Sequence, residues 1–99
     1  MKRLLIPVLL AFGLATATGA SAAVTKYTFD GVTFSDGTSG VIEAAVKTTN
    51  KSHVTVCNYY STGHVDFLGY YQDYNGSFAS TDPAAVEQFC LDHYAERTV

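Results

Sequence analysis

Polar and apolar side chains alternate along "HVTVCNYY", positions 53–60, which is the pattern of a β-strand with two different faces. In this pattern Cys57 and Tyr59 share one face, and Asn58 and Tyr60 share the other. Similar alternation in "VTKYTF" and "HVDFLGYYQDY" predicts two more strands. A further segment, "VIEAAVK", has β-branched residues near its ends and alanines in its middle. We interpret it as a strand rather than a helical turn.

Turn residues separate these segments. Asp30-Gly31 has the chemistry of a two-residue hairpin turn, so "VTF" is expected to return along the first strand. The stretches "SDGTSG", "TTNKS" and "STG" predict the later connections. Asn75-Gly76 is another predicted turn, and it precedes "SFAS", which is expected to add a short edge strand.

The C-terminal segment has a helical period instead. Asp82 before Pro83 predicts an N-cap followed by proline at the first helical position, and the helix is expected to run to about Glu96. The apolar face of this helix is predicted to be Val86, Phe89, Cys90, His93 and Tyr94. Strands followed by one helix predict an α+β fold, a small antiparallel sheet of four to five strands with a single C-terminal helix packed on it.

The N-terminus has the composition of a secretory signal peptide, residues 1–22. Lys2 and Arg3 precede an apolar stretch of about 14 residues, which is too short to span a membrane. Ala20-Ser21-Ala22 supplies the small residues of a cleavage site. The segment looks bacterial, so we expect a secreted or periplasmic protein with one domain, residues 23–99, and no membrane span after cleavage.

The chain has two cysteines, Cys57 and Cys90. In an oxidising compartment they are expected to form a disulfide that joins the helix to a central strand. With His53 and His93 they would also supply the ligands of a structural zinc site. Neither Cys–His pair has the Cys-x-x-Cys spacing of a zinc finger. We therefore favour the disulfide and expect no metal and no cofactor.

The charge of the chain argues against a nucleic-acid partner. The formal net charge is −3, and removal of Lys2 and Arg3 leaves −5. The remaining cations are scattered along the chain. Phosphate backbones and anionic membrane surfaces are bound by clustered cations, so neither is an expected partner.

No catalytic residue is predicted. His64 lies near Ser61 and Asp66, and His93 follows Asp92, so a serine, a histidine and an acid are available for a hydrolase. No motif brings such a set together. A small secreted hydrolase using His64 or His93 is therefore kept as the alternative function.

Tyrosines gather in two strands that are expected to pair through the "STG" turn. Because successive residues of a strand face opposite ways, one tyrosine of each pair is expected in the core and the other on the far side. We group Tyr59 with Tyr71 and Tyr60 with Tyr70. Tyrosine is enriched at binding sites, although ordinary cross-strand packing is the competing explanation. The candidate binding residues are Tyr59, Tyr60, Tyr70, Tyr71, Tyr74 and Asp73.

These features together predict a small exported protein that binds without catalysis. The expected partner is a protein or a cell-envelope component such as a glycan, held on a tyrosine-rich sheet surface. A structural or stress-related envelope protein is a further alternative.

Overall fold

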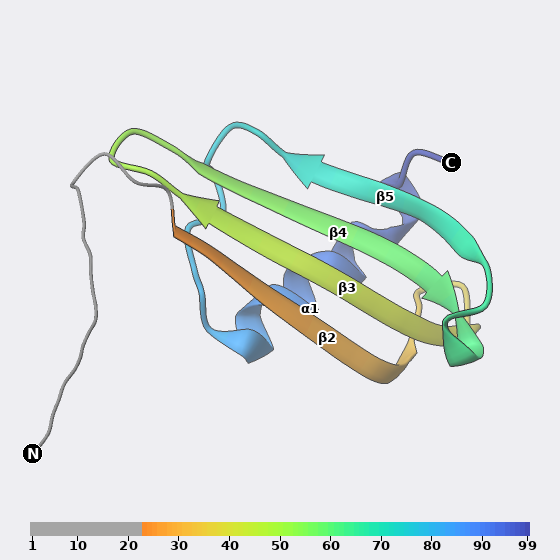
Figure 1. Ribbon diagram of the computed structural model, residues 1–99. Coiled ribbons are helices and arrows are strands. Elements are labelled where there is room, and N and C mark those ends of the chain that lie inside the picture. The colour runs from red at the N-terminus through yellow and green to blue at the C-terminus, as the bar shows by residue number, and fades with distance from the viewer. Residues whose placement is uncertain (1–22) are drawn as a thin grey trace, which may run out of the picture.

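The computed structural model describes residues 23–99; the predicted signal peptide, residues 1–22, lies outside the described residues. The strands β2 (Ala23–Thr33), β3 (Ser39–Thr48), β4 (His53–Ser61) and β5 (Phe67–Asp73) form one antiparallel sheet in chain order (Figure 1). The helix α1 (Pro83–Asp92) lies behind this sheet in Figure 1. The short 3₁₀ helices η3 (Thr62–His64) and η4 (Tyr94–Glu96) follow β4 and α1. The predicted α+β fold is confirmed.

The core lies between α1 and one face of the sheet. Alternate residues of each strand point to it, because side chains of a strand alternate between the two faces. Its most buried members are Val32, Phe34, Ile42, Ala44, Val46, Cys57, Tyr59, Val86, Cys90 and Tyr94. The alternation predicted for β4 is therefore correct.

The helix begins as its sequence predicts. Asp82 is the N-cap, and its carboxylate accepts a hydrogen bond of 3.1 Å from the backbone N–H of Ala85. The helix ends at Asp92, earlier than expected, and Tyr94 continues the buried face from the 3₁₀ turn that follows. Within residues 23–99 no helix has the length and apolar character needed to cross a membrane.

The prediction of a hairpin turn at Asp30-Gly31 is wrong. The strand β2 runs through this dipeptide, which forms a bulge where the register with β3 shifts between Phe29 and Val32. Gly31 has a φ of 64° at this point, and the extra residue lets Phe29 and Val32 both face the core. The chain turns back at the second Asp-Gly pair, where Phe34 N–H donates to the carbonyl of Thr38 at 2.7 Å.

The fourth strand is shorter than "HVDFLGYYQDY" predicts, because it begins only at Phe67, after η3. Its register with β4 shifts again, since Tyr60 stands opposite Phe67 and Tyr59 opposite Gly69. This shift places Phe67 against Tyr60 instead of on the face of Tyr71. The "SFAS" segment, expected as an edge strand, has no strand structure.

The C-terminus covers the outer edge of β5. Tyr70 and Thr98 exchange two backbone hydrogen bonds, of 2.9 and 2.7 Å. Arg97 donates from Nε to the carbonyl of Leu68 at 2.7 Å, and its guanidinium lies 4.0 Å from the ring centroid of Tyr94. The tail thus hides part of a sheet edge that would otherwise expose unpaired backbone groups.

Candidate binding surface on the open face of the sheet

One face of the sheet is left without a covering element among residues 23–99 (Figure 1). We call it the open face. Its side chains are those that alternate with the core residues of each strand, aligned by the strand register. They include Lys26, Thr28, Glu43, Ala45, Asn58, Tyr60 and Tyr70. No element within residues 23–99 covers these side chains, so they are accessible to a partner.

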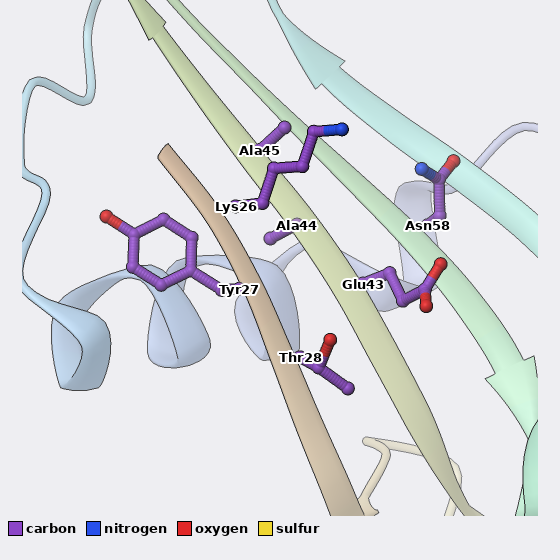
Figure 2. A pocket seen from close by; sticks show the side chains of 7 residues that line it. All are labelled: Lys26, Tyr27, Thr28, Glu43, Ala44, Ala45 and Asn58. Carbon is purple, nitrogen blue, oxygen red and sulfur yellow. The ribbon is translucent and has the colours of Figure 1, made fainter. Parts of the chain in front are cut away.

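The open face is hollowed at its middle. The hollow has a volume of about 360 Å³ and is lined by Lys26, Tyr27, Thr28, Glu43, Ala44, Ala45 and Asn58. Figure 2 shows Lys26 and Thr28 on β2, Glu43 and Ala45 on β3 and Asn58 on β4, with the small side chain of Ala45 beside Lys26. Ala45 stands between Lys26 and Val56 in the register, so its methyl group leaves room that a larger side chain would fill.

Three polar side chains of the hollow have no partner among the residues that the structure describes. Within residues 23–99, Lys26, Thr28 and Asn58 make no side-chain hydrogen bond or ion pair. Asn58 is half-buried, and it stands opposite Glu43 in the strand register. Their donors and acceptors are therefore free for a ligand.

The carboxylate of Glu43 is held from the side by His64. His64 Nε2 lies 3.2 Å from Glu43 Oε2, and both side chains are partly exposed. The His64 ring stacks on Tyr60 at 3.8 Å between centroids. The backbone of His64 has a φ of 62°, an uncommon value for a non-glycine residue. The turn therefore places an imidazole beside the carboxylate that borders the hollow.

The tyrosines divide between the two faces as grouped from the sequence. Tyr59 is fully buried, and its hydroxyl donates to the carbonyl of Cys90 at 2.6 Å. Tyr71 faces α1 and stacks on His93 at 4.2 Å. Burial raises the pKa of Tyr59 well above its usual value, and desolvation also raises the pKa of Tyr71. Tyr59 is thus a core residue and is removed from the candidate binding set.

The tyrosines of the open side differ in how much ring they expose. Tyr60 is half-buried because His64 and Phe67 pack against it. Tyr70 is 37% exposed and Tyr74 is 67% exposed, and neither ring packs on another aromatic ring within residues 23–99. Tyr74 donates a hydrogen bond to Gln72. Tyr70, opposite Asn58 in the register, is the ring best placed beside the hollow.

Asp73, a candidate binding residue from the sequence, is 5% exposed and serves the local structure. Its carboxylate accepts hydrogen bonds of 3.2 Å from Asn75 N–H, Ser77 Oγ and Phe78 N–H. These bonds fix the loop after β5 and leave Asp73 little capacity to contact a partner.

The disulfide between Cys57 and Cys90 is confirmed, with their Cα atoms 5.7 Å apart. It joins β4 to α1 through the buried face of each element. Because the two sulfurs are bonded to each other, neither is a thiolate for the zinc site considered with His53 and His93. No cluster of three or more His, Cys, Asp or Glu side chains in residues 23–99 has the arrangement of a metal site.

The sequence patterns did not predict that Lys26, Glu43 and Asn58 lie near one another. Each lies at an alternating position of its own strand, but no motif links the three strands in sequence. The register aligns Lys26 with Ala45 and Glu43 with Asn58. Each strand has a polar residue on the same face, and this was the sequence signal for a shared site. The strand register was needed to show that these residues are neighbours.

No protein-family model, curated protein or solved structure matches this chain. The function is therefore inferred from the geometry of the open face.

Proposed function

We propose that this protein is a small exported binding protein that acts without catalysis through the open face of its sheet. The observation that carries the proposal is the hollow over Ala45, where Lys26, Thr28 and Asn58 have no partner within residues 23–99. Small-ligand sites combine a concave surface with a few convergent polar groups. The partner is a protein or a cell-envelope component such as a glycan.

Export is supported by two independent features. The sequence of residues 1–22 predicts a signal peptide, and the Cys57–Cys90 disulfide is of a kind that persists in oxidising compartments. A secreted or periplasmic location follows from the proposal. It is checked by fractionating the cells that make the protein and locating the processed chain.

The binding role is tested with two lysines of the same face. Lys26 lines the hollow, whereas Lys47 lies on the same face of β3 outside it. Binding of the purified protein to isolated cell envelopes and to exported proteins is measured for the wild type and for each alanine variant. We expect Lys26→Ala to weaken the retained interaction and Lys47→Ala to leave it unchanged. Equal effects of the two variants, or no retained interaction, would reject the proposal.

A hydrolase is the second candidate, and the His64–Glu43 pair is the observation in its favour. A histidine held by a carboxylate can act as a general base. Its nucleophile would be a water molecule, since no serine or threonine hydroxyl within residues 23–99 hydrogen-bonds to His64, and Ser61 Oγ accepts from Asp66 N–H at 2.8 Å. Turnover of an envelope polymer that is lost in His64→Ala would favour this candidate.

A further inference from the structure

The polar groups of the hollow favour a ligand that carries an amide of its own. Asn58 presents a carbonyl acceptor and an NH₂ donor, and neither has a partner within residues 23–99. An acetamido group has one N–H and one carbonyl, so it can satisfy both groups of Asn58 at once. The carboxylate of Glu43, opposite Asn58 in the register, is an acceptor for a neighbouring hydroxyl.

The charges around the hollow favour an uncharged ligand. Lys26 supplies one cation and Glu43 one carboxylate, and they form no ion pair with each other. Lys26 can donate a hydrogen bond to a hydroxyl or carbonyl oxygen of a ligand. Glu43 can accept a hydrogen bond from a ligand hydroxyl. A ligand with a net charge of either sign would be attracted by one of these two groups and repelled by the other, so a net charge brings no advantage. Hydroxyl groups, which donate and accept, suit both sides.

The position of the hollow disfavours an extended peptide. Backbone hydrogen-bonding groups of a sheet point along its plane, so peptides that add as strands pair with an edge. The hollow lies on the face, over Ala45 of the inner strand β3, and offers side chains instead. A ligand with hydrogen-bonding groups around a compact ring fits this arrangement better than a chain that needs backbone pairing.

The size of the hollow and the neighbouring ring of Tyr70 also favour a compact ring ligand. A volume of about 360 Å³ is at the small end for ligand sites, which suits one or two rings of a longer chain lying across an open surface. Tyr70 stands opposite Asn58 and packs on no other ring within residues 23–99. The electron-rich face of its ring can contact the polarised C–H groups of a sugar.

We propose that the hollow binds a 2-acetamido sugar of a glycan chain, with Asn58 pairing the acetamido group, and with Lys26 and Glu43 bonding the ring hydroxyls. This inference rests on the proposed binding function and names its ligand. It requires no metal and no covalent step.

The test uses two trisaccharides with the same linkage. Triacetylchitotriose carries an acetamido group where cellotriose carries a hydroxyl. Each is titrated into the purified, disulfide-bonded protein labelled with ¹⁵N, and amide shifts are followed by NMR. We expect triacetylchitotriose to shift the amides of Glu43, Ala45 and Asn58, and cellotriose to bind at least several-fold more weakly. Loss of one hydrogen bond corresponds to roughly a three- to tenfold change in Kd.

Variants separate the site from the surrounding surface. Asn58→Ala and Lys26→Ala are each expected to raise the Kd for triacetylchitotriose on the order of three- to tenfold. Lys47→Ala, on the same face outside the hollow, is expected to leave it unchanged. The NMR spectrum of each variant reports whether the fold is retained, and shifts mapped on the wild type do not depend on any variant.

Each other outcome has a defined meaning. Equal binding of both trisaccharides would overturn the role of the acetamido group, and shifts confined to residues away from the hollow would overturn the site. If neither sugar binds but Lys26→Ala still weakens binding to a protein partner, the glycan inference fails and the proposed function stands. If no partner of any class depends on Lys26, both fail.

Discussion

The hydroxyl of Tyr59 donates a hydrogen bond of 2.6 Å to the backbone carbonyl of Cys90, the residue whose side chain is bonded to Cys57. One residue of α1 is therefore linked to β4 twice, once through its sulfur and once through its backbone. Cys57 and Tyr59 lie two positions apart on β4, so both point to the same face. This double link fixes where the helix lies on the sheet and keeps it off the open face.

The first prediction concerns the disulfide. Closing a loop with a sequence separation of 33 restricts the unfolded chain and is worth roughly 3–4 kcal/mol. Reduction, or the double variant Cys57→Ala with Cys90→Ala, should lower the free energy of unfolding by about that amount. Urea denaturation with and without reductant measures the change.

The purified protein should also lack titratable thiols when denatured, and its mass should rise by two hydrogens on reduction. Stoichiometric zinc together with two free thiols in protein from the exported fraction would contradict the disulfide.

The second prediction concerns alkaline pH. Burial raises the pKa of Tyr59 above its usual value, so the folded protein keeps this proton while the unfolded chain loses it above about pH 10. Unfolding then releases a proton, and the free energy of unfolding falls as pH rises past about 10, by at most about 1.4 kcal/mol per pH unit for this group. Below that pH the contribution is fully present. Urea denaturation at a series of pH values measures the decline.

Tyr59→Phe is the matched variant, since it removes the titratable hydroxyl group and keeps the aromatic ring. At neutral pH it should cost about 0.5–1.5 kcal/mol for the lost hydrogen bond. Its alkaline decline should be shallower than that of the wild type. An unchanged decline would mean that another group, such as Tyr71, releases the proton.

The elements could be predicted from sequence where one local rule dominated. Alternation predicted β4 and the face of Cys57, and the Asp82-Pro83 pair predicted the start of α1. The face of α1 and the face of β4 each placed a cysteine toward the core. The disulfide itself was predicted from the export signal and the presence of only two cysteines, and the agreement of the two faces is consistent with it.

The failures occur where two signals compete. Asp30-Gly31 and Asp36-Gly37 have the same turn chemistry, and packing decides between them, because a bulge at Gly31 lets Phe29 and Val32 both reach the core. The register shift opposite Tyr59 and Tyr60 similarly moves Phe67 to the other face. A strand pattern does not specify bulges, which depend on what the neighbouring strand buries.

The candidate site was predicted only in part. The division of the tyrosine pairs between the two faces follows from alternation. Composition alone could not distinguish a buried carboxylate whose hydrogen bonds are made within the protein, such as that of Asp73, from one that is free to bind a partner. The hollow depends on the register of three strands and on the small size of Ala45. That register is a long-range property of the fold.

The third prediction concerns Gly69, where the C-terminal tail crosses β5. A Cβ atom at Gly69 would lie 2.6 Å from the carbonyl oxygen of Thr98, and the φ of Gly69 is 122°. Gly69→Ala should therefore destabilise the protein by more than about 1 kcal/mol and displace the tail. Hydrogen exchange at the Thr98 amide, which donates to Tyr70, reports the displacement.

Gly37→Ala is the control for backbone strain, since Gly37 has a φ of 89° and no atom within 4 Å of the added Cβ. The difference between the two variants isolates the contact with the tail. Equal destabilisation, with the Thr98 amide still protected, would show that the tail is not held by this crossing.

The last prediction compares adjacent tyrosines on opposite faces of β5. Tyr71 packs against His93 and Phe89 on the helix side, so Tyr71→Ala should cost about 2 kcal/mol or more in stability. Tyr70 lies on the open face and packs on no ring within residues 23–99, so Tyr70→Ala should change stability by only about 0.5 kcal/mol. Binding should show the reverse order, with Tyr70→Ala costing about 1 kcal/mol or more, close to a fivefold rise in Kd. If Tyr60 and Tyr70 can be replaced together without weakening binding, neither ring contacts the partner, which is then held elsewhere.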